Sequence, residues 1–371
     1  MNPTVKRKVL IYLLGSLGDT LIAIPALRAI RRHFGDAELV LLHNSHDGNI
    51  VNSSQVLGRY LIDGYIQYGR ADGAAGKLRE FVRLRNEIRK HRFDAIINLV
   101  DSERPARSVK RDEFFFRACR IPRRIGFNLF SQEKLYPIDE FGYPALTDNE
   151  ALRKLKRNAI NGISFSDADL RQPTLELTEA DREFSRDWRS ANNLLGPRFV
   201  ALAPGCKQPS NLWPLERFIN LASRIRAKGY KILVLGGENE RQLGRELIEV
   251  VGGGTSAAGD LTVRQSAAIM ADAECYVGLD TGSTHLAAAV GLRCFVISGQ
   301  RVNPGQWYPL GEGHYVVAHK VPCAGCRAFA CPVAGHPCML DIAVEDAWAS
   351  FEKFSSSNES SGNADVTAIH V

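Results

Sequence analysis

The chain has 371 residues, of which 45% are hydrophobic and 24% are charged, so it is long enough for two domains and has the composition of a soluble globular protein. No stretch reaches the roughly 18–20 uninterrupted apolar residues that a membrane-spanning helix needs, and the short apolar run near the start is not followed by a small-residue cleavage pattern. We therefore expect a cytoplasmic protein.

The formal net charge of +6 is unevenly spread, because basic residues recur densely between Lys77 and Arg124. This density indicates either a solvated helix face or a surface that attracts anions. The segment has no recognisable nucleic-acid-binding module and no series of stacking aromatic residues, so nucleic acid is not the expected partner. An acidic, phosphate-bearing substrate or a membrane surface fits the charge better.

Short apolar runs alternate with helical segments along the chain, a pattern typical of parallel sheets with crossover helices. In the first half, strands are predicted at Val9–Leu14, Glu38–His43 and Ala95–Val100, and helices at Thr20–Phe34 and Lys77–Lys90. Pro25 falls inside the first of these helices, so we expect a kink or a delayed helix start there.

The alternation of strands and helices resumes at Phe199. Strands are predicted at Phe199–Ala203, Lys231–Leu235, Cys275–Leu279 and Cys294–Ser298, and helices at Leu215–Lys228, Glu240–Val251, Val263–Ala271 and Thr284–Val290. Two α/β halves, each opening with a strand and a glycine-containing turn, indicate two Rossmann-like domains. We place them in residues 1–185 and 186–354, with a polar crossover at 150–193. The Ser- and Asn-rich tail, 355–371, is expected to be disordered.

Three motifs follow one another in a defined order. "GSLGDTLIAIPALRAI" begins at Gly15, "PGCKQPSNLWPLERFINLA" covers 204–222 and "GLDTGSTHLAAAVG" covers 278–291. Their order and spacing resemble glycosyltransferase family 9, the bacterial ADP-heptose:lipopolysaccharide heptosyltransferases, from Val9 to about Phe351. The resemblance implies a GT-B architecture, in which two Rossmann-like domains face each other across a cleft. The first would hold the acceptor and the second the nucleotide-sugar donor. It also implies inverting transfer of heptose from ADP-heptose to a lipopolysaccharide core.

The last motif indicates a strand that ends at Leu279, a turn of small polar residues and then a helix. The start of a helix offers unpaired backbone N–H groups and the positive end of its dipole, which suit a diphosphate. An ordinary helix cap is the alternative for the polar residues, and a packed core residue is the alternative for the histidine. With the family resemblance added, the predicted donor-binding residues are Asp280, Thr281, Gly282, Ser283, Thr284 and His285.

In the family, the loop after the first strand of the second domain carries a lysine two residues before a Trp-Pro pair, and this loop reaches the donor phosphates. Here that position is Asn211, which is a departure. We expect Lys207, in the same loop, to neutralise the diphosphate instead, and Asn211 stays a donor-binding candidate. Glu240 matches the family's ribose-binding carboxylate, although an acid there can also simply favour a helix start.

The first motif contains "GSLGD", which is Gly-x-x-Gly-Asp and not the Gly-x-Gly-x-x-Gly dinucleotide fingerprint, so a nicotinamide oxidoreductase is poorly supported. In inverting glycosyl transfer the acceptor hydroxyl loses its proton as it attacks the anomeric carbon. Asp19 matches the family's catalytic aspartate and is the predicted general base. It is also a candidate N-cap of the first helix, and both roles can hold. This account requires no cofactor and no divalent metal.

Four cysteines cluster late in the chain, at Cys323, Cys326, Cys331 and Cys338. The spacing of the first pair is typical of thiolate metal sites, and His336 offers a further ligand, whereas reduced and packed thiols are the alternative. Some family members that heptosylate proteins carry a thiolate-bound metal. A structural metal would therefore favour a protein acceptor. Single cysteines at Cys119, Cys206, Cys275 and Cys294 are expected to be small buried hydrophobes.

Two further alternatives stay open. The departure at Asn211 leaves room for another nucleotide-sugar donor. From a different class, the chain could be an inactive nucleotide-sugar-binding protein, against which the presence of Asp19 argues.

Overall fold

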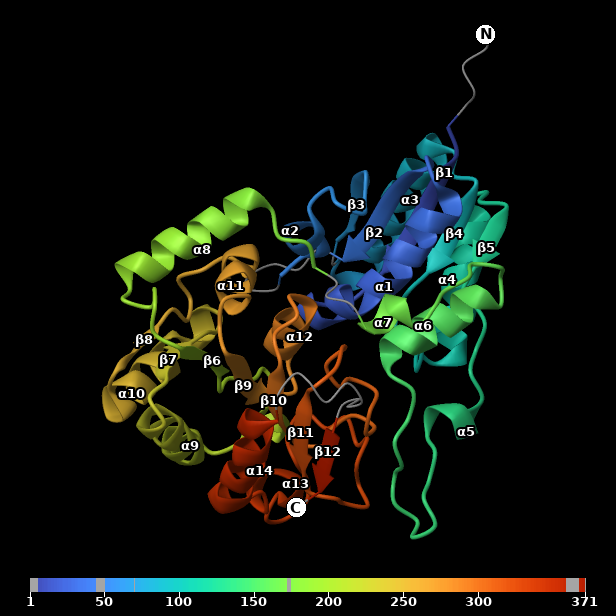
Figure 1. Cartoon of the computed structure of the whole chain (residues 1–371). Coiled ribbons are helices and arrows are strands. Elements are labelled where there is room, and N and C mark those ends of the chain that lie inside the picture. Colours follow the sequence, from blue (N-terminus) through green and yellow to red (C-terminus); the bar gives the residue numbers. More distant parts are fainter. Residues whose placement is uncertain (1–5, 45–50, 70, 172–174, 358–366, 371) are drawn as a thin grey trace. The chain divides into compact units, whose positions relative to one another are not determined.

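A computed structural model of the protein describes residues 6–44, 51–69, 71–171, 175–357 and 367–370 (Figure 1). The chain divides into two compact units. Unit 1 comprises Met1–Leu135 and Glu150–Leu170, and unit 2 comprises Tyr136–Asn149 and Arg171–Val371. The single boundary predicted after residue 185 falls inside helix α8 (Glu179–Ala191), which belongs to unit 2.

Unit 1 is built on a parallel sheet with the strand order β3-β2-β1-β4-β5. The strands are β1 (Lys8–Leu13), β2 (Glu38–Asn44), β3 (Gly64–Tyr68), β4 (Ala95–Asn98) and β5 (Arg123–Ile125). β1 lies between β2 and β4, with Ile11 opposite both Leu41 and Ile97. These central strands are almost continuous apolar runs because helices cover both faces of a parallel sheet.

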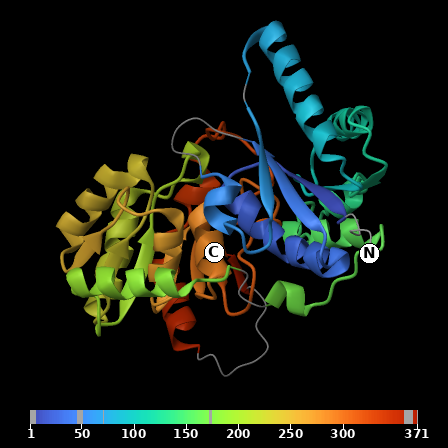
Figure 2. The ribbon, with the colours of Figure 1, turned by 90° about the horizontal axis from the view of Figure 1, so that it is seen from above.

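The helices of unit 1 follow the strands in the expected alternation. They are α1 (Leu17–Phe34), α2 (Ser53–Leu57), α3 (Gly73–His91), α4 (Ala106–Ala118), α5 (Gln132–Leu135), α6 (Glu150–Ala159) and α7 (Ala168–Arg171), which ends at the unit boundary. Helix α1 begins at Leu17 and contains the buried Pro25. Of the two alternatives predicted from this proline, a kink or a delayed start, the delayed start is therefore wrong. The first half of α3 extends away from the sheet of unit 1 (Figure 2).

Unit 2 is built on a second parallel sheet, with the order β12-β11-β10-β9-β6-β7-β8. The strands are β6 (Phe199–Ala203), β7 (Lys231–Val234), β8 (Gly254–Ser256), β9 (Cys275–Leu279), β10 (Cys294–Ser298), β11 (Tyr315–Ala318) and β12 (Thr367–His370). β12 pairs with β11, so this part of the tail predicted to be disordered is a strand. Residues 358–366 and 371 of that tail lie outside the described residues.

The remaining helices of unit 2 cover its sheet. They are α9 (Leu215–Ala227), α10 (Arg241–Val251), α11 (Val263–Met270), α12 (Gly282–Ala289), α13 (Pro337–Leu340) and α14 (Val344–Ser356), with short 3-10 turns η1 (Pro209–Asn211) and η2 (Glu238–Glu240). Phe295 of β10 packs edge-on against Phe351 of α14, with ring centroids 5.5 Å apart. Both units are Rossmann-like, so the predicted α/β fold class is confirmed.

No helix in the described ranges is both long enough and apolar enough to cross a membrane.

Candidate active site

The strand order of unit 1 reverses between β1 and β4. In open α/β sheets, ligands bind outside the carboxyl ends of the strands at such a reversal. Tyr12 of β1 pairs with Asn98 of β4, so the loops that follow these strands leave the same edge of the sheet. The first loop leads to Asp19 and the second to Asp101. Both carboxyl groups therefore lie where the fold places a site.

Asp19 is the third residue of helix α1, whose N-cap is Ser16 and not Asp19 as the alternative reading had it. Its Oδ2 accepts a hydrogen bond from the backbone N–H of Ser16 at 2.8 Å. The carboxyl group also lies directly over Gly15. A Cβ atom built on Gly15 would stand 2.0 Å from Cγ of Asp19, and Gly15 has a φ of +136°. The turn thus requires glycine because the carboxyl group occupies that space.

The surroundings of Asp19 raise its pKa. Burial is the largest cause, and the neighbouring Asp101 adds to it, whereas the Ser16 N–H and the Lys154 ammonium partly offset the rise. A carboxyl group with a raised pKa accepts a proton more readily than an ordinary aspartate. Asp19 therefore combines a position at the strand-order reversal of unit 1 with a raised pKa.

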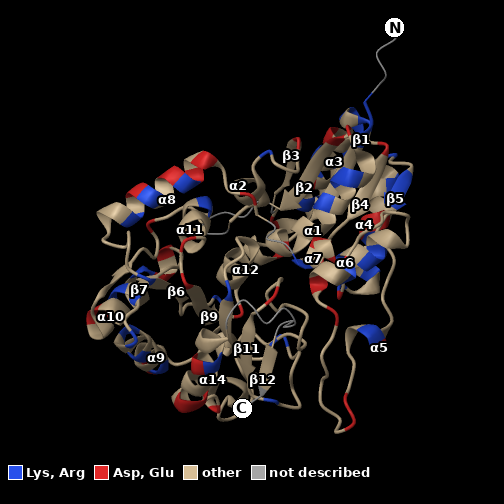
Figure 3. Cartoon of the chain, viewed as in Figure 1, with Lys and Arg blue, Asp and Glu red and all other residues tan. Residues whose placement is uncertain are grey.

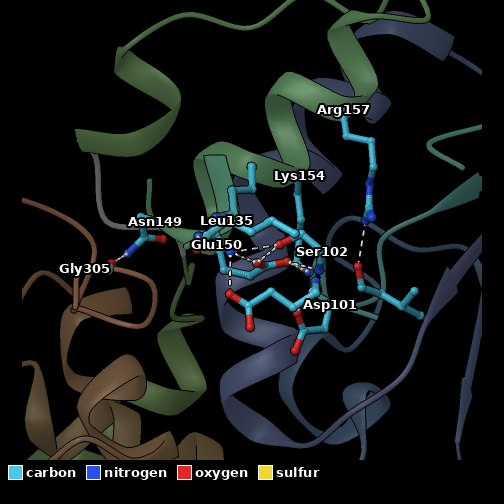
Figure 4. A network of polar contacts seen from close by, with 11 residues as sticks. Asp101, Ser102, Leu135, Asn149, Glu150, Lys154, Arg157 and Gly305 are labelled. Atoms are coloured by element: carbon cyan, nitrogen blue, oxygen red, sulfur yellow. Dashed lines mark hydrogen bonds and ion pairs between the residues drawn. The ribbon is translucent and has the colours of Figure 1, made fainter. Parts of the chain in front are cut away.

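The sequence patterns did not predict a network of buried charged residues centred on α6 (Figure 4). Glu150 accepts hydrogen bonds from the Ser102 backbone N–H at 2.9 Å and from the Lys154 ammonium at 2.8 Å. The Arg157 guanidinium donates to the Val100 carbonyl at 2.7 Å. Glu150 and Lys154 are 0% and 1% exposed. The network fixes the loop after β4, and it sets a positive charge near Asp19.

The pKa of Glu150 reflects this arrangement. Burial by itself would raise the pKa, but the charges of Lys154 and Arg157 and the hydrogen bonds from Lys154 and Ser102 hold it below its usual range. Glu150, Arg153, Lys154 and Arg157 follow the i, i+3, i+4, i+7 spacing of one helix face. That spacing was the available signal, although a charged face usually indicates contact with solvent.

In unit 2 the strand order reverses between β6 and β9, and Asn211 joins the loops there. Its Nδ2 donates to the carbonyl oxygen of Asp280 at 2.8 Å, and its Oδ1 accepts from the Gly299 N–H at 3.3 Å. Asn211 is only 4% exposed. Both ends of its amide thus hold the loops after β9 and β10, so the structure gives Asn211 a positioning role.

In the turn that begins α12, some of the predicted donor-binding hydroxyls are accessible to solvent and one is buried. Thr281 is the N-cap and Gly282 the first helical residue, and the first backbone N–H groups of a helix have no partner within it. The hydroxyls of Thr281 and Ser283 lie 2.7 Å apart and are half-buried. The Thr284 hydroxyl, predicted to face a phosphate, is fully buried and donates to the carbonyl of Leu279, because this helix position points inward.

Asp280 and His285 flank this turn and are both shifted by burial. Burial raises the pKa of Asp280 to about 7, against the opposing charge of Arg301. Burial lowers the pKa of His285 to about 4, so this histidine is neutral near pH 7. The His285 ring packs edge-on against Trp307 at a centroid distance of 5.7 Å. It is therefore packed in the interior, as the alternative interpretation held.

Glu240 lies across two neighbouring loops at the same sheet edge. A Cβ on Gly205, after β6, would stand 2.2 Å from Cγ of Glu240, and one on Gly236, after β7, would stand 2.7 Å from its Cβ. Its Oε2 accepts from the Gly237 N–H at 2.7 Å. Lys207, in the loop after β6, is exposed. Both predicted residues thus lie on loops that leave the carboxyl edge of the sheet.

The four late cysteines are all free thiols. Burial, and then the neighbouring Cys331, Cys323 and Cys326 thiols, raise the pKa of Cys338 to about 12, so the four lie near one another. Across the described residues, no group of three or more His, Cys, Asp or Glu side chains is arranged to hold a metal ion. A ring nitrogen of His336 lies 3.0 Å from the Ser210 carbonyl oxygen instead.

The single cysteines follow the expectation with one exception. Cys119, Cys275 and Cys294 are buried, whereas Cys206 is half-buried in the loop after β6.

Comparison with known proteins gives a consistent result. The model of glycosyltransferase family 9 (heptosyltransferase) matches residues 81–335. Lipopolysaccharide heptosyltransferase 3 of Escherichia coli is 22% identical over 281 residues, which are 74% of this chain and 78% of that protein. Lipooligosaccharide heptosyltransferase 2 of Campylobacter jejuni is 22% identical over 351 residues, 91% of this chain and 95% of that protein. The structure of E. coli ADP-heptose lps heptosyltransferase II has a TM-score of 0.65 at 17% identity, covering 94% and 98% of the two chains.

Proposed function

The chain belongs to glycosyltransferase family 9, the heptosyltransferases, and we propose that it is an inverting enzyme that transfers heptose from ADP-heptose to a lipopolysaccharide core or a related acceptor. The observation that carries this proposal is Asp19, a half-buried carboxyl group with a raised pKa at the strand-order reversal of unit 1. The names of the similar proteins support the donor and the acceptor class.

In the proposed reaction Asp19 takes the proton of the acceptor hydroxyl as its oxygen attacks the anomeric carbon. The bond from that carbon to the diphosphate oxygen breaks on the opposite face, so the configuration inverts and ADP leaves. The first N–H groups of α12 and the Lys207 ammonium would stabilise the negative charge of the leaving group. Glu240 would accept hydrogen bonds from the ribose hydroxyls. Every step in this scheme uses groups of the chain itself, so we propose a metal-independent mechanism.

We also propose a peripheral contact with the cytoplasmic face of the inner membrane, where a glycolipid acceptor would reside. The support is the α3/α4 face, which we define as Leu78, Phe81 and Val82 of α3 and Phe114 of α4; these side chains are 42–70% exposed. Phe81 packs edge-on against Phe115 at 5.0 Å, which brings the two helices together. Basic residues are numerous on both helices (Figure 3). Apolar side chains among cations suit an anionic membrane surface.

A panel of donors tests the reaction. The purified chain is incubated with ADP-heptose, UDP-sugars or GDP-sugars and truncated lipopolysaccharide acceptors, and nucleotide release and the anomeric configuration of the product are measured. Release of ADP from ADP-heptose, with an inverted product, is the expected result. Release with UDP- or GDP-sugars alone would overturn the donor assignment. Donor binding without transfer to any acceptor would favour an inactive binding protein.

A protein acceptor is the second candidate, and it would be favoured by a metal ion bound to the late cysteines, of which Cys323 and Cys326 have the spacing of a thiolate metal site. Elemental analysis of the freshly purified protein tests it. Stoichiometric zinc or iron would support a structural metal on the thiols and direct the search to protein acceptors. A metal content far below stoichiometric would leave the thiols as packing residues and favour the glycolipid.

A further inference from the structure

Arg301 lies in the loop that follows β10 of unit 2, three residues after the strand ends at Ser298. β9 and β10 are parallel neighbours, and Leu279 pairs with Ile297, so the chain segments after both strands leave the same sheet edge. The Asn211 side chain bonds to the carbonyl of Asp280 in one segment and to the N–H of Gly299 in the other. Arg301 comes two residues after this tether. Its backbone is therefore held beside the turn that begins α12.

The guanidinium of Arg301 is fixed by a second segment. Its Nε donates to the Ala328 carbonyl at 2.9 Å and its Nη2 to the Arg327 carbonyl at 3.2 Å, while the Arg327 N–H donates to the Arg301 carbonyl at 2.9 Å. A guanidinium has five N–H donors. Within the described ranges, Nη1 has no hydrogen-bond partner, so this half-buried side chain is oriented and still has donors to offer.

The backbone on both sides of this contact is in an unfavourable conformation. Gln300 and Arg327 are non-glycine residues with φ of 50° and 55°. Such left-handed conformations disfavour side chains and persist where the surrounding structure enforces them, commonly at functional sites. The turn is thus maintained at an energetic cost next to the predicted donor residues.

The charge of Arg301 acts on the same turn. It opposes the burial-driven rise in the pKa of Asp280, and it acts in the same direction on the Cys206 thiol in the loop after β6. The guanidinium is therefore within electrostatic range of two of the loops that meet at the strand-order reversal of unit 2. Lys207, by contrast, is an exposed side chain on a flexible stem.

We infer that Arg301 binds the diphosphate of the nucleotide-sugar donor and supplies the fixed positive charge that the family's lysine would provide at the position of Asn211. The inference rests on the proposed function of this site. A planar guanidinium makes paired hydrogen bonds to phosphate oxygens, and an orienting bond from Nε leaves the terminal nitrogens for that purpose. The same charge stabilises the nucleoside diphosphate as it leaves. Arg301 would then make the site bind diphosphates more tightly than uncharged ligands.

Binding of ADP and adenosine to the full chain, measured by calorimetry or competition, separates this role from a structural one. Arg301→Gln is expected to weaken ADP binding by about 10- to 100-fold, the loss that follows from removing a charge-assisted contact. Adenosine binding stays unchanged. The matched control is Arg217→Gln, because Arg217 is also half-buried and its Nη1 donates to the carbonyls of Leu340 and Ile342 at 2.7 and 2.6 Å. This control leaves both affinities unchanged.

Wild-type ADP affinity in Arg301→Gln would overturn the inference, as would an equal loss of ADP and adenosine binding, which marks a structural brace. Arg301→Lys, which keeps the charge without the paired geometry, is expected to lose less affinity than Arg301→Gln. A wild-type protein that binds UDP or GDP in place of ADP contradicts the proposed donor alone, and Arg301 is then judged with that nucleotide and its nucleoside. A wild-type protein that binds no nucleoside diphosphate would overturn both proposals.

Discussion

Gly15 and Asp19 share one small volume at the end of β1: a Cβ on Gly15 would stand 2.0 Å from Cγ and 2.2 Å from Oδ2 of Asp19. The glycine is therefore a condition for the position of the carboxyl group. Asp19 in turn accepts the Ser16 N–H in the first turn of α1. The geometry of the predicted base thus depends on a residue that carries no side chain.

Gly15→Ala tests this dependence. The added methyl group must displace the Asp19 carboxyl group, and displacement of a reacting group by about 1 Å costs on the order of 100-fold in rate. We expect a loss of kcat of that size, with ADP affinity unchanged. Gly35→Ala is the control, because Gly35 also has a positive φ, of +56°, but no atom lies within 4 Å of its Cβ position. A variant of Gly35 as inactive as Gly15→Ala would contradict the steric explanation.

Lys154→Met tests the buried network on α6. It leaves the Glu150 carboxylate without its ammonium partner, and removal of one member of a buried pair costs about 3–5 kcal/mol of unfolding free energy. Because Lys154 also lowers the pKa of Asp19, the acid limb of the kcat/KM profile should move to higher pH. Urea denaturation and the pH profile measure the two effects. An unchanged acid limb would show that Lys154 acts on stability alone.

The lowered pKa of Glu150 determines how the stability of the protein changes with pH. The stabilisation from its ionised form is complete above the ordinary glutamate pKa of about 4.3 and is lost as the pH falls through the lower folded-state value. Glu150→Gln should therefore lose less stability between pH 5 and acid than the wild type. Thermal midpoints across that range measure it, and parallel curves for the two proteins would contradict the assignment.

Asp280 predicts a pH dependence of donor binding. Its pKa of about 7 means that the carboxyl group is neutral below pH 7 and ionised above it, where it repels a diphosphate. The charge that acts on it is that of Arg301. Burial and the Asp280 charge itself both raise the pKa of the nearby Cys206 and Tyr308, so neither adds a charge near pH 7. ADP affinity should fall several-fold as the pH rises through 7. Asp280→Asn retains only the pH dependence of the ligand itself.

The same raised pKa affects folding. Stability linked to Asp280 is fully present below the ordinary aspartate pKa of about 3.9 and is lost as the pH rises through the folded-state value of about 7. Asp280→Asn should remove this loss. A wild-type ADP affinity that stays constant from pH 6 to 8 would contradict the proposed proximity of Asp280 to the diphosphate.

The α3/α4 face predicts binding to anionic vesicles. A double change, Phe81→Ser with Phe114→Ser, should weaken co-sedimentation with phosphatidylglycerol-containing vesicles by at least about tenfold, given about 1.5–3 kcal/mol for each buried phenylalanine. Transfer to a water-soluble acceptor should be unchanged. Phe329→Ser is the control, since Phe329 is 67% exposed on unit 2. Equal vesicle binding by all three proteins would contradict this surface.

The sequence predicted the central strands because a parallel strand covered on both faces is an apolar run, as in β1 and β9. The strands it missed are short, and some are polar, such as β5, which contains Arg123 and Arg124, and β8, which is Gly254–Ser256. The missed β11 (Tyr315–Ala318) is apolar but has only four residues. The motifs located Asp19 and the turn before α12. They did not locate Glu150 and Lys154, because burial of a charged pair depends on partners from distant parts of the chain.

Side-chain direction explains the remaining differences. Thr284 carries a hydroxyl in the right motif, but its helix position points into the core, where Leu279 accepts its hydrogen bond. Asn211 stands at the expected place in its loop, yet the loops after β9 and β10 take up both ends of its amide. A one-dimensional motif does not encode these directions. Arg301, in contrast, lies outside the three motifs. The pairing of β9 with β10 places it near the predicted donor loops.

The central claim is that Asp19 removes the proton from the acceptor hydroxyl. Asp19→Asn tests it most directly, because the amide oxygen still accepts the Ser16 N–H and preserves the start of α1. The measurement is kcat for heptose transfer, together with the Kd for ADP. We predict that kcat falls by about 10²- to 10⁴-fold, as expected for the loss of a general base, while the Kd for ADP is unchanged. Turnover near the wild-type rate in this variant would contradict the account.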